Sequence, residues 1–180
     1  MRFRRNETPP PEPARRPVEF DWRVHAAQET WTAKVDAKAA IVLSLETAIL
    51  VVLLAAHAPH RLLGQFTGWR STFAGLAIGL YVMAMVLAAV AVIPLLGPTK
   101  KHRAEHDRNV IYFGHLRHWR HEDLNQWLGR MSQDDELAQL SRQLIELSRR
   151  NWQKHRSLQL SMLTALFGAA LLGIAVLVPR

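Results

Sequence analysis

Three long apolar runs constrain the fold of this chain more than any other feature of its sequence. They cover residues 39–56, 73–96 and 160–178, and Glu46 is the only charged side chain within them. A bilayer core takes about 20 residues of helix, so runs of 18, 24 and 19 residues are long enough to cross it. The pattern predicts an all-α integral membrane protein with three transmembrane helices and argues against a soluble globular fold.

The placement of basic residues predicts the topology. Eight Lys and Arg precede the first run, two lie between the first and second runs, and twelve lie between the second and third. Because cytoplasmic loops carry the excess of Lys and Arg, we expect the N-terminus and residues 98–157 in the cytoplasm, and residues 57–71 and the C-terminus outside. The net charge of +8 then fits a membrane surface, and we expect no nucleic-acid partner.

Several classes of chemistry are excluded. The sequence has no cysteine, which rules out disulfides, cysteine-ligated metals and thiol nucleophiles. No Walker A, Rossmann, GxSxG or paired-carboxylate pattern is found. We therefore expect a protein that is not an enzyme and that uses no cofactor.

The first 20 residues contain five prolines and five arginines and lack an apolar core, so they do not resemble a cleavable signal peptide.

The chain divides into a tail and one domain. Residues 1–18 are rich in Pro and Arg and are predicted to be disordered, whereas residues 20–178 are predicted to form the membrane domain. After Phe20, apolar residues recur at spacings of three and four, which predicts one helix that continues through the first span. The residues in this stripe are Val24, Ala27, Trp31 and Val35.

A second long helix is predicted to begin at Ser132. Ser132 and Asp135 have the spacing of a capping box, and leucines at alternating spacings of three and four lead into the third span. Two of the transmembrane helices are therefore expected to extend into a cytoplasmic helical stalk, with residues 112–129 lying against it.

Glu46 is an acid near the middle of the first span. A charge at this depth costs at least about 2.5 kcal/mol, and intramembrane acids commonly mark functional paths. Glu46 is a candidate for membrane function, lining a polar path between subunits. The alternative is a neutral, hydrogen-bonded carboxyl that only joins helices.

Gly75 and Gly79 form a GxxxG spacing in the second span. Small residues at this spacing allow two helices to approach closely. We predict that these glycines form an oligomer interface and that the protein is a homo-oligomer. Packing within one chain is the alternative.

The predicted cytoplasmic region contains candidate ligand-binding residues. Aromatic rings provide stacking faces, and basic side chains provide charge for a phosphate. In the alternative interpretation the aromatic rings pack the stalk or lie at the headgroups, and basic residues near the third span anchor it to anionic lipids. The candidates are Tyr112, Phe113, Arg117, Trp119, Arg120, Asn151 and Lys154.

Histidines three or four residues apart suggest a zinc site, which we do not predict. His115, His118 and His121 drift around a helix, and the neighbouring Arg117 and Arg120 would repel a cation. We expect no metal.

Several segments together resemble the Pycsar effector family, small membrane proteins of bacterial anti-phage defence. The resemblance covers about residues 22–178 and is carried by Trp31 through Asp36-Ala37-Lys38-Ala39-Ala40-Ile41-Val42-Leu43-Ser44-Leu45, by Tyr112-Phe113, and by Leu137 through Leu147 and Lys154. Where such proteins often carry a small or Asn-Gly-type pair, this chain has Glu46-Thr47.

The resemblance implies a function and a location. A partner cyclase would sense infection and make a cyclic pyrimidine nucleotide, cyclic CMP or cyclic UMP. The effector would respond by impairing the bacterial inner membrane, causing cell death or growth arrest. A non-enzymatic membrane scaffold or accessory subunit that recruits a cytoplasmic partner is the alternative function.

Overall fold

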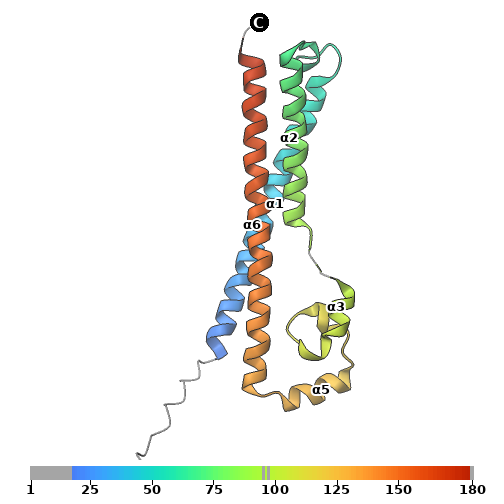
Figure 1. Cartoon of the computed structure of the whole chain (residues 1–180), viewed down its shortest axis with the longest axis vertical. Helices are drawn as coiled ribbons and strands as arrows, with labels where there is room; N and C mark the ends of the chain where they lie inside the picture. The colour runs from blue at the N-terminus through green and yellow to red at the C-terminus, as the bar shows by residue number, and fades with distance from the viewer. Residues whose placement is uncertain (1–17, 95, 97, 179–180) are drawn as a thin grey trace, which may run out of the picture.

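A computed structural model describes residues 18–94, 96 and 98–178 (Figure 1). Every regular element in these residues is helical, which confirms the all-α prediction. The predicted disordered tail, residues 1–18, lies outside the described residues except for Val18, where the first helix begins. The helices are α1 (Val18–His57), η1 (Leu63–Gln65), α2 (Trp69–Val92), α3 (Thr99–Ala104), η2 (His106–Arg108), α4 (Phe113–Leu116), α5 (His121–Arg130) and α6 (Gln133–Leu177).

Within the described residues, three helices are long and apolar enough to cross a membrane: α1, α2 and α6. They contain 40, 24 and 45 residues. At about 1.5 Å per residue, α6 is roughly 67 Å long, about twice the thickness of a bilayer core. The prediction of three helices able to span a membrane is therefore confirmed, and α1 and α6 extend well beyond the apolar part.

The predicted second span ends later than α2 does. The apolar run continues to residue 96, but α2 ends at Val92 and Ile93 is extended, with φ −62° and ψ 130°. Pro94 follows, and a proline disfavours the helical conformation of the residue before it. The end of this helix is thus set by the proline and not by the end of the apolar run.

The three long helices pack side by side in the upper part of the molecule (Figure 1). Their contact surfaces are built from small and aliphatic side chains, and α2 presents buried alanines such as Ala77, Ala84 and Ala88. Large apolar side chains face outward instead, for example Val52 at 66% and Phe167 at 67% exposed. An apolar exterior around a tightly packed interior is the arrangement that a lipid environment stabilises.

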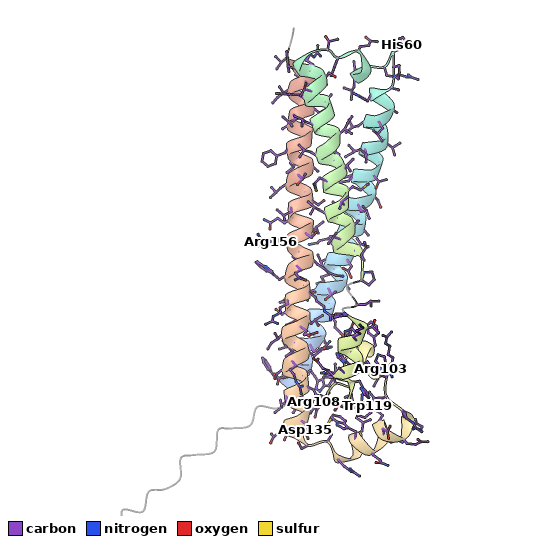
Figure 2. All side chains as sticks on the ribbon, turned by 45° about the vertical axis from the view of Figure 1, so that its right-hand side comes forward. His60, Arg103, Arg108, Trp119, Asp135 and Arg156 are labelled. Carbon is purple, nitrogen blue, oxygen red and sulfur yellow. The ribbon has the colours of Figure 1, made fainter. Side chains whose placement is uncertain are left out.

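Residues 99–130, which contain α3, η2, α4 and α5, form a separate small unit that we call the distal module. It lies beside the lower half of α6, and His60 in the α1–α2 connection lies at the opposite end of the molecule (Figure 2). The backbone N–H of Val110 donates to Gln139 Oε1 on α6 at 2.9 Å, which attaches the loop of the module to that helix.

The start of α6 has the predicted capping box. The backbone N–H of Asp135 donates to Ser132 Oγ at 3.2 Å, and Asp135 Oδ2 accepts from the backbone N–H of Ser132 at 3.0 Å. The Ser132 hydroxyl also donates to Asp135 Oδ2 at 2.6 Å, and this bond, followed by the one from the Ser132 backbone N–H, lowers the pKa of the Asp135 carboxyl below its ordinary value. A reciprocal cap satisfies two otherwise unpaired N–H groups, so α6 has a well-defined beginning.

Candidate functional site

Polar side chains pair α1 with α6 along their shared surface. Thr32 Oγ1 donates to Asn151 Oδ1 at 2.5 Å, and Asn151 Nδ2 donates to the Gln28 carbonyl at 3.1 Å. Residue numbers rise in the same direction along both helices, from Thr32 with Asn151 to Glu46 with Ser161. α1 and α6 are therefore parallel neighbours, and Asn151, a predicted ligand residue, contacts α1.

Lys154 extends this contact towards the membrane span. Its Nζ lies 2.5 Å from Asp36 Oδ1, and the Lys154 side chain is buried while that of Asp36 is 39% exposed. Because the ammonium and the carboxylate compensate each other, the pair holds the two helices in register. We call the contacts of Gln28, Thr32 and Asp36 with Asn151 and Lys154 the helix clasp.

Glu46 lies inside the bundle of this chain. Ser161 Oγ donates to Glu46 Oε1 at 2.6 Å, and the two residues are 3% and 0% exposed. Glu46 Oε2 is also buried and has no hydrogen-bond partner among the described residues. In this arrangement the acid joins α1 to α6. Its predicted role in membrane function requires the hydrogen bond to Ser161 to change, and that role stays a prediction.

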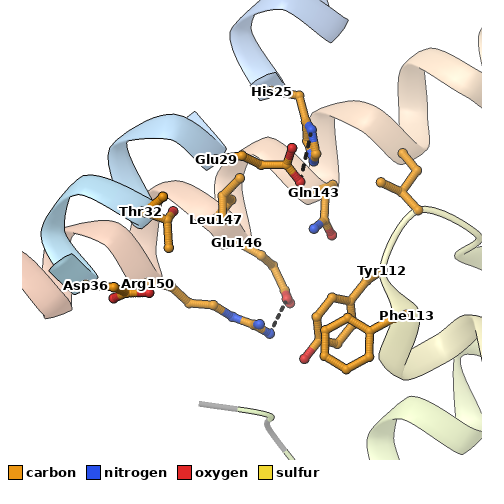
Figure 3. A pocket seen from close by; sticks show the side chains of 12 residues that line it. His25, Glu29, Thr32, Asp36, Tyr112, Phe113, Gln143, Glu146, Leu147 and Arg150 are labelled. Atoms are coloured by element: carbon orange, nitrogen blue, oxygen red, sulfur yellow. Dashed lines mark hydrogen bonds and ion pairs between the residues drawn. The ribbon is translucent and has the colours of Figure 1, made fainter. Parts of the chain in front are cut away.

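A cavity of about 430 Å³ lies between α1, α6 and residues 111–113, where the chain enters α4 (Figure 3). Its walls come from three segments that are far apart in the sequence. Two of the predicted ligand residues, Tyr112 and Phe113, line it. The full lining is His25, Glu29, Thr32, Ala33, Asp36, Ile111, Tyr112, Phe113, Gln143, Glu146, Leu147 and Arg150.

Arg150 provides the cation of this cavity. Its guanidinium carbon lies 4.8 Å from the centre of the Tyr112 ring, and its Nη2 lies 3.3 Å from Glu146 Oε2. The sequence alone assigned Arg150 to the basic stretch before the third span and not to a ligand site. Only the α1–α6 pairing places Arg150 and the α1 residues His25 and Glu29 around one space.

The three remaining predicted ligand residues, Arg117, Trp119 and Arg120, lie elsewhere in the distal module. Trp119 Nε1 donates to the His106 carbonyl at 2.7 Å, and its ring contacts Trp127. Arg120 is exposed and lies 3.4 Å from Glu122. The cavity that Tyr112 lines is not lined by Arg117, Trp119 or Arg120. The structure therefore separates the predicted residues into three locations: the cavity, the helix clasp and the rest of the distal module.

The histidines of the distal module contact one another in pairs. The rings of His102 and His115 are 4.8 Å apart, and those of His106 and His118 are 6.3 Å apart. Among the described residues, no group of three or more His, Cys, Asp or Glu could hold a metal ion. Burial of His102, assisted by the cations around it, lowers the pKa of its imidazole.

Gly75 and Gly79 do not contribute to packing within this chain. A Cβ atom built at either glycine would meet nothing within 4 Å, whereas one built at Gly168 on α6 would lie 3.2 Å from Tyr81 Cδ2. The close approach of α2 and α6 therefore depends on Gly168. Gly75 and Gly79 therefore face outward, and their role in an oligomer interface stays a prediction.

These features define the class of protein: a helical membrane protein whose two longest helices line a cavity of mixed polar and aromatic side chains at one end and pack in an apolar bundle at the other. A family model described as the Pycsar effector protein domain matches residues 20–179, and the chain belongs to this family. Membership makes it an effector of anti-phage cyclic-nucleotide signalling, in a family whose members are generally not enzymes. No curated protein and no solved structure matches the chain.

Proposed function

We propose that a cyclic pyrimidine nucleotide, cyclic CMP or cyclic UMP, activates this protein and that the activated protein impairs the bacterial inner membrane. A partner cyclase would supply the nucleotide after infection. The N-terminus and residues 98–157 would face the cytoplasm, as the distribution of basic residues favours. The effector would act as a homo-oligomer and would cause cell death or growth arrest without catalysing a reaction.

One observation carries this proposal. α1 and α6 line the cavity and continue without a break into the apolar bundle. Asp36 at the cavity is ten residues before Glu46, and Arg150 is eleven residues before Ser161. At about 1.5 Å per residue, the cavity is roughly 15 Å from the intramembrane hydrogen bond along both helices. A ligand that changes the separation of the helices at the cavity would also act on Glu46 and Ser161.

The pathway to membrane damage follows from the buried acid. If α1 and α6 rotate or separate, Glu46 loses Ser161 and needs another polar partner, because an unpaired carboxyl in an apolar bundle is costly. Water or the Glu46 of another subunit could then satisfy it. A wetted path through the bundle would dissipate the membrane potential.

The test measures membrane potential in bacteria. Cells carry the effector together with a cyclase that makes cyclic CMP or one that makes cyclic UMP. We expect potential to collapse only when the effector and an active cyclase are both present. A catalytically inactive cyclase is the control. Growth arrest with normal potential would contradict membrane impairment and would favour the scaffold alternative.

A further inference from the structure

We propose that the cyclic nucleotide binds in the cavity between α1, α6 and residues 111–113, with its phosphate on Arg150 and its base against Phe113. This inference rests on the proposed function and assigns a binding site to it. It also moves the site away from Arg117 and Arg120, where the sequence alone placed most of the charge.

The cavity has the size and the variety of groups that a mononucleotide requires. Its volume of about 430 Å³ lies within the range of about 300–1,000 Å³ typical of small-molecule sites. It combines two adjacent aromatic rings, Tyr112 and Phe113, with one guanidinium and several hydrogen-bonding side chains. Stacking on aromatic rings binds bases, and the fork of an arginine binds phosphate oxygens.

Arg150 is held in position before any ligand arrives. Its guanidinium lies over the Tyr112 ring and is paired with Glu146, so its long side chain is already ordered. Preorganisation of this kind lowers the entropy lost on binding. Phe113 is 62% exposed, which leaves much of its ring accessible to a base. Figure 3 shows the Arg150 tip beside the two aromatic rings.

The α1 wall supplies groups that can read the edge of a base. His25 is buried, and its Nε2 has no hydrogen-bond partner in the part of the chain that the structure describes. Its Nδ1 lies 3.8 Å from Glu29 Oε1. Leaving a buried ring nitrogen unpaired is unfavourable. A small rotation of the His25 ring would let a ligand group form a hydrogen bond with Nε2, which would offset that cost. Glu29 can accept from a base N–H or from the ribose hydroxyl.

The acidic residues around the cavity are compatible with an anionic ligand. Asp36 is paired with Lys154, and Glu146 is paired with Arg150. The third acid, Glu29, lies on the α1 wall beside His25, so a phosphate on Arg150 approaches the two acids whose charges are compensated. In contrast, Arg120 is exposed and paired with Glu122 on the surface, where screening makes a single cation a weak anchor.

Calorimetry on the full-length, detergent-purified protein tests the site, with cyclic CMP and cyclic UMP as ligands. Arg150→Gln removes the phosphate contact, and Phe113→Leu removes the stacking face while keeping an apolar side chain. Arg149→Gln is the matched control, because Arg149 is the adjacent exposed cation on α6 and does not line the cavity. Arg117→Gln with Arg120→Gln tests the competing location.

We expect the wild-type protein to bind at least one of the two nucleotides, and Arg150→Gln and Phe113→Leu each to raise Kd by about tenfold or more. Arg149→Gln and the Arg117/Arg120 double variant should stay within about twofold. Unchanged binding by both cavity variants would overturn the site and leave the proposed function standing. If the wild-type protein binds neither nucleotide, the proposed function fails, and the site with it. Thermal unfolding of each variant confirms that lost binding is not lost folding.

Discussion

Ser161 on α6 donates a 2.6 Å hydrogen bond to Glu46 on α1 in the interior of the helix bundle. Both side chains are almost completely buried, and the second carboxyl oxygen of Glu46 has no hydrogen-bond partner within the described residues. A buried carboxyl oxygen without a partner keeps the cost of its burial, and an arrangement of the helices that gives this oxygen a partner recovers part of that cost. This property suits a position that changes on activation.

Glu46 is expected to matter for activation and not for insertion. The remaining 17 residues of the 18-residue span carry no charge, so Glu46→Leu and Glu46→Gln should both reach the membrane at normal levels. Glu46→Leu removes charge and hydrogen bonding and should abolish cyclase-dependent toxicity, whereas Glu46→Gln should weaken it. Colony counts with and without the cyclase measure the effect.

Ser44→Ala is the matched control for these variants. Ser44 lies in the same span, is exposed and donates only to the Ala40 carbonyl of its own helix. It should retain full toxicity. Full toxicity of Glu46→Leu would show that the acid has only a structural role.

The Asp36–Lys154 ion pair should stabilise the association of α1 with α6. Lys154→Met leaves Asp36 without its cation, and loss of one charged hydrogen bond costs about 1–3 kcal/mol, near the low end here because Asp36 is partly exposed. We expect a lower melting temperature in detergent for Lys154→Met and for Asp36→Asn. Lys38→Met, at an exposed position of α1, is the control. Additive losses in the Asp36→Asn, Lys154→Met double variant would indicate that the two residues do not interact.

The distal module is expected to loosen as the pH falls below neutrality. Burial, followed by the electrostatic influence of His115, Arg150 and Arg117, lowers the pKa of His102 below its ordinary value of 6.5, and Glu146 partly opposes this shift. Because the folded state disfavours protonated His102, the stabilisation is complete above about pH 6.5 and is lost as the pH falls from there towards the lowered pKa.

Hydrogen exchange of peptides from residues 99–118 measures this loosening. After correction for the intrinsic effect of pH on exchange, protection should fall between about pH 7.5 and about pH 5.5. His102→Gln keeps a polar side chain that does not titrate and should flatten the change. Equal pH dependence in the wild-type protein and this variant would assign the effect to another group.

The outward glycines and the inward glycine should respond differently to substitution. Gly75→Leu with Gly79→Leu should leave the melting temperature nearly unchanged and reduce the oligomer mass in native mass spectrometry, if the GxxxG face joins subunits. Gly168→Leu forces a side chain against Tyr81 and should destabilise the chain by about 1–3 kcal/mol. An unchanged oligomer mass in the double variant would place the subunit interface on another face.

Cysteine labelling tests the topology directly, since the chain has no native cysteine. Within the α1–α2 connection, Gly64 is unsuitable as a position for the introduced cysteine, because a Cβ there would lie against the Ala58 carbonyl oxygen. Thr67, in the α1–α2 connection, and Gln126, on α5, are both exposed, and these two segments lie at opposite ends of the molecule (Figures 1 and 2). An impermeant reagent should label Thr67→Cys in intact spheroplasts and Gln126→Cys only after lysis. The reverse pattern would invert the proposed orientation.

The features that the sequence determined are local. Three apolar runs have the length of a bilayer core, and Ser132 with Asp135 carries the signal for the start of α6 within four residues. The continuity of α1 from its first turn into the span also follows from periodic apolar positions without an intervening proline or glycine. These properties depend on neighbouring residues and the solvent, so they could be predicted without the fold.

Which side chains meet was decided only by the tertiary structure. Periodicity identifies an apolar stripe, but it does not fix the rotation and axial offset of one helix against another. That offset pairs Asp36 with Lys154 and Glu46 with Ser161, residues more than 100 positions apart. It also encloses Arg150 with Tyr112 while leaving Arg120 on the surface. Each of these groups is present in the sequence, but the packing of the parallel helices α1 and α6 decides which of them share a cavity. A small difference in helix rotation moves a side chain from the shared interface to the lipid or to solvent.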